Sequence, residues 1–128
     1  MRVADAMSLQ VLEVGPHHTV KEAARLMSER HVGAAVVIDT DLPGPGIVTE
    51  RDVLRAVADG RDPATTPVSE IMTFDARQAS TDWDLDTAAA EMVRHGFRHL
   101  IVVDGDRLAG VLSMRDVVRA RVGTTTRR

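Results

Sequence analysis

Two short segments carry the residue types best suited to binding a small ligand. The first, GIVTERDVLR, runs over residues 46–55, and the second, GVLSMRDVVR, runs over residues 110–119. In each, a short apolar stretch leads to a hydroxyl residue and then to an Arg-Asp pair. A helix that begins at the hydroxyl residue offers unpaired amides to a phosphate. An ionised aspartate can accept both hydroxyls of a ribose through charge-assisted hydrogen bonds. Arg51 and Arg115 could reach a phosphate from the first helical turn.

The same residues also fit a purely structural role. Thr49 and Ser113 stand where a helix N-cap residue is expected. Asp52 and Asp116, three positions later, stabilise the start of a helix without any ligand. One copy taken alone favours capping. The second copy, with an arginine again before the aspartate, leaves both interpretations open.

Both segments belong to a longer internal duplication. An offset of 65 residues aligns residues 3–7 with 68–72 and residues 36–39 with 101–104. An offset of 64 aligns residues 46–56 with 110–120, because one turn is a single residue longer in the first copy. A frame kept over most of the chain indicates a duplicated unit.

Each copy has the same expected order of elements. In the first copy we expect an extended piece at 11–14, a helix capped by Thr19 and Glu22 and ended by left-handed Gly33, strands at 34–38 and 47–48, and a helix at 52–58. In the second copy we expect a helix capped by Asp84 and ended by Gly96, strands at 100–103 and 108–112, and a helix at 115–122.

The duplication also predicts the fold class. One unit of about 60 residues buries too little surface to be secure alone, whereas two units packed sheet to sheet bury the apolar strands of both. We therefore expect an α/β (α+β) fold of two pseudo-twofold-related repeats, each a small sheet with two helices. The expected divisions are repeat 1 over 1–62, a linker over 63–67, repeat 2 over 68–122 and a flexible tail over 123–128.

Composition excludes several classes of function. The 128 residues are 44% hydrophobic and 27% charged, which is typical of a globular protein. No apolar run approaches the roughly 18 residues of a membrane helix, and no secretory signal is recognisable, so we expect a cytoplasmic protein without membrane contact. A net charge of −3 and 2% aromatic residues supply neither the charge nor the stacking surfaces that nucleic-acid binding uses.

No set of residues predicts catalysis or a metal site. The chain has no cysteine, which excludes disulfides and thiolate chemistry. No nucleophile motif brings a serine, a histidine and an aspartate together. The neighbouring His17 and His18 lack further ligands, so no metal site is expected. We expect neither an enzyme nor a required cofactor.

The chain resembles a pair of CBS domains, a Bateman module. The resemblance is carried by the duplication, by the methionines that end residues 3–7 and 68–72, and by the two glycine–strand–Ser/Thr-x-x-Asp segments. The resemblance covers about residues 3–122. It implies a stand-alone regulatory or ligand-sensing module that binds an adenosine nucleotide (AMP-, ADP- or ATP-like) in the cleft between two repeats. It also implies a homodimer, with leftover apolar helix faces at Val53, Leu54, Val57, Val117 and Val118, and an unidentified protein partner.

The resemblance further implies roles for particular residues. Asp52 and Asp116 would hold ribose hydroxyls, while Thr49 and Ser113 would lie near ribose or phosphate. The base pocket would come from the start of a strand in the opposite repeat. The residues concerned are Arg98 and His99, after Phe97, for the first motif and Gly33 and Ala34, after Val32, for the second.

Two other functions remain open on the sequence. The chain could be a structural or protein-interaction CBS module that keeps the fold without binding a ligand, in which case its motifs act only as helix caps. A third hypothesis, an enzyme acting on nucleotides, is supported by no sequence feature.

Overall fold

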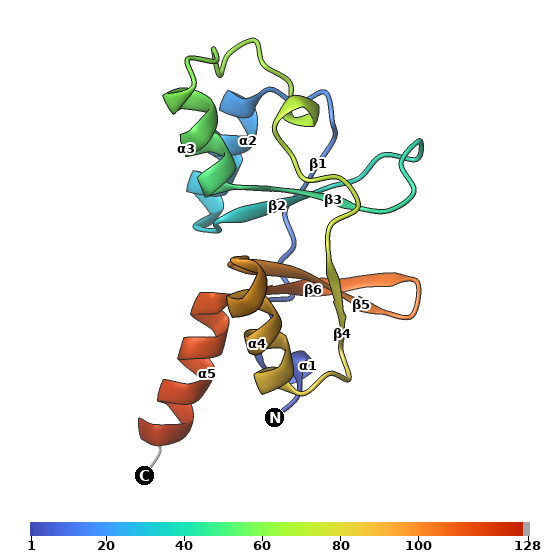
Figure 1. Cartoon of the computed structure of the whole chain (residues 1–128), viewed down its shortest axis with the longest axis vertical. Helices are drawn as coiled ribbons and strands as arrows, with labels where there is room; N and C mark the ends of the chain where they lie inside the picture. The colour runs from blue at the N-terminus through green and yellow to red at the C-terminus, as the bar shows by residue number, and fades with distance from the viewer. Residues whose placement is uncertain (127–128) are drawn as a thin grey trace. The chain divides into compact units, whose positions relative to one another are not determined.

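The computed structural model describes residues 1–126, with side chains through Gly123, and the chain divides into two compact units (Figure 1). Residues 12–76 form one unit, here called the first-motif unit because it contains Thr49 and Asp52. Residues 1–11, together with the chain from Arg77 onward, form the second-motif unit, which contains Ser113 and Asp116. Each unit has one three-stranded sheet.

In the first-motif unit the strand order is β1-β2-β3, with β1 parallel to β2 and β2 antiparallel to β3. Strand β2 is buried along its whole length, as its continuous apolar run predicts. The elements are β1 (Glu13–Val14), α2 (Val20–Arg30), β2 (Ala34–Val37), β3 (Gly46–Thr49), α3 (Glu50–Ala58) and the short 3₁₀ turn η1 (Val68–Glu70). The core is built from Leu12, Val14, Ala23, Met27, Ala35, Val37, Val48, Val68 and Met72.

The second-motif unit repeats this topology in the order β4-β5-β6, with one irregularity between Val102 and Val103. Its elements are α1 (Val3–Ala6), β4 (Gln78–Ser80), α4 (Leu85–His95), β5 (His99–Asp104), β6 (Arg107–Ser113) and α5 (Met114–Thr126). The core is built from Val3, Ala79, Leu85, Ala88, Met92, Leu100, Val102, Leu112 and Val117. Mixed α/β architecture and the duplicated sheet are confirmed.

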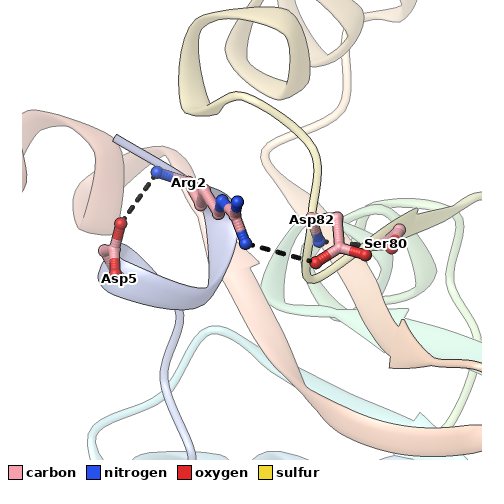
Figure 2. Close-up of polar contacts among 4 residues, drawn as sticks. All are labelled: Arg2, Asp5, Ser80 and Asp82. Atoms are coloured by element: carbon pink, nitrogen blue, oxygen red, sulfur yellow. Dashed lines mark hydrogen bonds and ion pairs between the residues drawn. The ribbon is translucent and has the colours of Figure 1, made fainter.

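The first residues of the two repeats, here called the opening segments (residues 1–8 and 66–73), are exchanged between the units. Val3 donates its amide to Trp83 O at 2.8 Å, and Leu85 donates to Met1 O at 2.8 Å. Around this contact, Asp5 accepts a hydrogen bond from the amide of Arg2, whose guanidinium lies 3.6 Å from Asp82 (Figure 2). The first segment is thus fixed beside the helix of the second repeat.

The equivalent bonds in the first-motif unit show that the exchange is mutual. Val68 donates to His18 O at 2.7 Å and Val20 donates to Thr66 O at 2.9 Å. Each pair of residues lies 65 positions from its counterpart in the other unit. The opening segment of each repeat therefore packs in the unit that contains the sheet of the other repeat. The expected linker at 63–67 is hydrogen bonded to the start of α2.

Most of the helix ends were correctly predicted. The capping box of α2 is present, with the amide of Glu22 3.1 Å from Thr19 Oγ1 and the amide of Thr19 3.1 Å from Glu22 Oε1. Asp84 caps α4 by accepting from the amide of Asp86 at 3.1 Å, and Gly96 ends it with φ 71°.

Two predicted helix ends were wrong. Helix α2 ends two residues before Gly33, because His31 adopts the left-handed conformation with φ 56°; histidine is among the residues that tolerate it. Helix α5 continues to Thr126, beyond the predicted end at Val122. The last two residues of the predicted tail lie outside the described residues.

Two glycines let the opening segments run directly against the sheets. Ser8 exchanges backbone hydrogen bonds with Val111, and Thr73 exchanges them with Ile47, at 2.9–3.1 Å. A methyl group on Gly110 would lie 2.5 Å from Ser8 O, and one on Gly46 would lie 3.0 Å from Thr73 O. Any larger residue must therefore push the backbone of the opening segment away.

We predict that Gly110→Ala lowers the free energy of unfolding by about 1–3 kcal/mol, the usual cost of forcing extra atoms into packed structure. Urea denaturation should show a lower midpoint with an unchanged slope. Gly15→Ala is the matched control, because its added methyl meets only His18 at an ordinary 3.5 Å. Equal midpoints for the two variants would contradict the prediction.

Candidate functional site

The first motif forms a complete capping box at the junction of β3 and α3. The Oδ2 oxygen of Asp52 accepts hydrogen bonds from the Thr49 amide at 2.8 Å and from the Thr49 hydroxyl at 3.0 Å. In return, the amide of Asp52 donates to Thr49 Oγ1 at 3.3 Å. Both side chains are half-buried. The capping role predicted for them is confirmed.

The second motif repeats the arrangement at the junction of β6 and α5. The amide of Ser113 donates to Asp116 Oδ2 at 2.9 Å, and the amide of Asp116 donates to Ser113 Oγ at 3.0 Å. Asp116 is only 8% exposed. A buried carboxylate needs such donors, because a charge removed from water is costly unless it is hydrogen bonded.

Each cap uses only the Oδ2 oxygen of its aspartate. Oδ1 of Asp52 has no hydrogen-bond or ion-pair partner within the described part of the chain, whereas Oδ1 of Asp116 lies 3.8 Å from Nη1 of Arg119. A carboxylate offers about four acceptor positions. Holding a helix start through one oxygen therefore does not prevent the other from accepting a ribose hydroxyl.

A capping box by itself does not indicate a ligand. Thr19 and Glu22 form the same reciprocal bonds at the exposed start of α2, where no ligand is expected. The backbone and side-chain hydrogen bonds from Thr19 lower the pKa of the Glu22 carboxyl. What distinguishes the two Ser/Thr-x-x-Asp motifs from this box is the strand that lies beside them.

Each motif lies next to the start of the neighbouring strand in its own unit. Ala34 pairs with Thr49 across β2 and β3, and the amide of Glu50 donates to Gly33 O at 2.9 Å. The structure thus brings Gly33 and Ala34 together with Thr49 and Asp52. The sequence assigned these strand starts to the opposite motif, and that assignment stays a prediction.

The second-motif unit makes the matching contacts. His99 pairs with Ser113 across β5 and β6, and the amide of Met114 donates to Arg98 O at 2.9 Å. Arg98 and His99 are therefore fixed neighbours of Ser113 and Asp116. The signal that could have revealed this is the antiparallel register, since the first strand of a hairpin begins beside the residue where the second strand ends.

These contacts also define what the helix starts can offer an anion. In the first turn of α3, the amide of Glu50 donates to Gly33 and that of Asp52 donates to Thr49. The amide of Arg51, between them, has no such acceptor in the described part of the chain. In α5 the same accounting leaves the amide of Arg115. Neither amide has a partner among the described residues. Of the first three amides in each helix, only the second can therefore donate a hydrogen bond to a phosphate.

The arginines of the motifs are available for an anion. Arg51, Arg98 and Arg115 are exposed, and no hydrogen bond or ion pair of their side chains forms within the described residues. Arginine presents a planar set of donors that matches a phosphate. Arg119 also lies at the second motif, but its guanidinium forms an ion pair with Asp116. The sequence analysis did not predict this pair, although the i, i+3 spacing on a helix was an available signal.

The described part of the chain contains neither a cluster of potential metal ligands nor a helix able to cross a membrane. No group of three or more histidine and acidic side chains is arranged to hold a metal ion in the described residues. Nδ1 of His18 instead accepts the amide of Gly15 at 3.0 Å. Within residues 1–126, no helix has the length and apolar character needed to cross a membrane.

We predict that Asp116→Ala lowers the free energy of unfolding by about 1–3 kcal/mol, because it leaves a part-buried Ser113 amide without an acceptor. Asp116→Asn is the matched control and should recover most of the loss, since its carbonyl oxygen can still accept that amide. Denaturant titration of the three proteins tests the pair. If Ala and Asn variants unfold alike, the cap is not what the carboxylate contributes to stability.

Comparison with known proteins divides the chain into the two sequence repeats and not into the two compact units. The family model for the CBS domain matches twice, over residues 3–59 and 68–123. The CBS domain-containing protein YhcV of Bacillus subtilis is 38% identical over 116 residues, which cover 90% of this chain and 81% of YhcV.

Solved structures agree in fold over nearly the whole chain. A CBS domain protein from Pyrobaculum aerophilum complexed with AMP has a TM-score of 0.82 and 30% identity, covering 97% of this chain and 99% of that one. The hexameric CBS-CP12 protein from bloom-forming cyanobacteria has a TM-score of 0.87 and 28% identity, covering 92% and 69%. Two family matches that span most of the sequence, together with these relatives, show that the chain is a CBS-domain pair and belongs to the CBS domain family.

Proposed function

We propose that the protein is a non-enzymatic regulatory module that binds an adenosine nucleotide, AMP-, ADP- or ATP-like, at its Ser/Thr-x-x-Asp motifs. One observation carries the proposal: the aspartate of each motif caps its helix through Oδ2 alone. In Asp52 the Oδ1 oxygen has no other partner among the described residues. An aspartate whose position is fixed by a cap, and which keeps a second oxygen for a ligand, is pre-organised to bind ribose hydroxyls.

The other groups at each motif suit the rest of a nucleotide. An amide in the first helical turn and an exposed arginine, Arg51 or Arg115, are the donors that a phosphate uses. The AMP complex of the P. aerophilum relative supports an adenine nucleotide as the ligand class. Each residue named here contacts the ligand without changing it, so no catalytic residue is required.

Binding at this junction offers a direct route to regulation. The motif aspartate lies in the first turn of α3 or α5, and each helix carries exposed apolar side chains further along. A ligand that binds one arrangement of the helix start more tightly shifts the population toward it. A protein partner that contacts the helix would then respond to the nucleotide.

A structural or interaction module without a ligand is the second candidate. The completeness of both capping boxes favours it, because the motif residues already have a role in the absence of a ligand. The ion pair between Arg119 and Asp116 adds to this, since it engages the second carboxylate oxygen. Ligand titration separates the two candidates.

We predict that an adenosine 5′-phosphate raises the unfolding temperature in a panel of AMP, ADP, ATP, NAD and S-adenosylmethionine. A ligand at 100 times its Kd should stabilise the protein by about 2.7 kcal/mol. The 2′-deoxy analogue should bind more weakly, because it lacks one of the hydroxyls that the aspartate accepts. The double variant Asp52→Asn/Asp116→Asn keeps both caps and should lose the effect.

The control for this panel is Glu22→Gln, which alters a capping box away from both motifs. Stabilisation of the double variant equal to that of wild type would show that the motif carboxylates do not bind the ligand. If no adenosine compound stabilises wild-type protein, the non-binding module is the correct function.

We further propose that the protein acts as a homodimer through apolar side chains of α3 and α5. Leu54 is 70% exposed, and Val57, Val118 and Val122 are each more than half exposed. Two other valines that were predicted to belong to these faces do not: Val53 packs against the core of its unit, and Val117 is part of the core of the other. The hexameric CBS-CP12 relative supports self-association in this family.

We predict that sedimentation velocity at micromolar concentration shows a dimer for wild type and a monomer for Leu54→Arg/Val118→Arg. A charge in the centre of an apolar contact removes the burial that drives association. Val93→Arg is the matched control, because Val93 on α4 is 73% exposed but lies outside these faces. A monomeric wild type would exclude the dimer.

A further inference from the structure

We propose that the two motifs are not equivalent: the motif at Ser113 and Asp116 binds the phosphate-bearing ligand, whereas the motif at Thr49 and Asp52 binds adenosine without requiring a phosphate. This inference rests on the proposed function and assigns a ligand class to each of its motifs. It depends on charge differences at structurally equivalent positions within the two units.

The first difference lies at the start of the neighbouring strand. Gly33 and Ala34 flank the first motif, and Arg98 and His99 occupy the same places beside the second. The backbone of Arg98 is anchored there by the hydrogen bond from Met114 to its carbonyl. Its exposed guanidinium has no partner in the described residues. The second motif therefore has a cationic side chain attached at a position where the first has only the hydrogen of a glycine.

The second difference lies at the first residue of the helix. Glu50 occupies that position in α3, and Met114 occupies it in α5. Both residues donate their amides to the carbonyl at the neighbouring strand start, so their positions are equivalent. Glu50 is exposed. A second carboxylate therefore stands one residue from Arg51 and two from Asp52, and repels an anion.

The third difference concerns the motif aspartates themselves. Nη1 of Arg119 lies 3.8 Å from Asp116 Oδ1 and offsets part of its charge. Arg55, the equivalent residue on α3, makes no ion pair with Asp52 among the described side chains. The carboxylate of Asp116 therefore repels a nearby phosphate less strongly, because Arg119 offsets part of its charge. The carboxylate of Asp52 has no such partner among the described side chains.

The charges at the equivalent positions have opposite signs. The strand start and the first helical turn carry a net charge of +1 at the second motif, where Arg98 and Arg115 oppose Asp116. They carry −1 at the first motif, where Glu50 and Asp52 oppose Arg51. A negatively charged phosphate is attracted by a net positive charge and repelled by a net negative one. The phosphate dianion of AMP is therefore directed to the second motif, while uncharged adenosine meets no such penalty at the first.

Isothermal titration of the full chain with AMP and with adenosine tests this assignment. Asp116→Asn and Arg98→Gln should each weaken AMP binding at least tenfold. Asp52→Asn should abolish binding of adenosine at the first motif and should weaken AMP less than Asp116→Asn does. Arg98 is exposed, so its variant folds whether or not Asp116→Asn does.

A charge-neutralising pair gives an independent readout. Glu50→Gln should raise the AMP affinity of the first motif two- to fivefold, whereas Glu29→Gln, on α2 and away from both motifs, should leave all affinities unchanged. If Arg98→Gln has no effect on AMP, or if Asp52→Asn weakens AMP as much as Asp116→Asn, the assignment is overturned and the proposed function stands. If neither compound binds wild type, both fail together.

Discussion

The register of one antiparallel strand pair in each unit positions both the Ser/Thr-x-x-Asp motif and the glycine beside the opening segment. In the first-motif unit, Ala34 pairs with Thr49 at one end of this ladder and Val37 pairs with Gly46 at the other. The first end places the motif beside a strand start, and the second places the glycine against which the opening segment runs. A slip of one residue would reverse every side chain of the strand. Site and core therefore depend on the same four backbone pairs, and the second unit repeats them.

The motif aspartates illustrate how one side chain can serve both stability and binding. A residue that binds a ligand gains affinity when its own position is fixed beforehand. In both units the helix cap supplies that fixation, because the hydroxyl residue and the aspartate hold each other through paired bonds. The structural and functional interpretations of the pattern are thus complementary. The two copies differ both in the strand start beside the motif, with Gly33 in one and Arg98 in the other, and within the motif, with Glu50 in one and Met114 in the other.

Much of the fold could be predicted from local pattern. The duplication, the box at Thr19 and Glu22, the stop at Gly96 and the buried run of β2 depend on residues close together in sequence. Three features could not be predicted in this way. The exchange of opening segments depends on backbone bonds between residues far apart in sequence, such as Val3 and Trp83 in one unit and His18 and Val68 in the other. The left-handed His31 replaces a glycine present in the other copy. The i, i+3 spacing of Asp116 and Arg119 permits an ion pair, but Asp52 and Arg55 have the same spacing and no ion pair between them in the described part of the chain, so spacing alone did not predict it.

The exchange of opening segments bears on how the chain folds as it is synthesised. The first-motif unit is continuous from Leu12 to Ala76, so all of its residues have been synthesised once the ribosome has passed Ala76. The second-motif unit joins the first eleven residues to a stretch that begins at Arg77. Closing so long a loop carries an entropic cost and slows folding. The first residues of the chain therefore cannot reach their native partners, such as Trp83 and Val111, until those later residues have been synthesised.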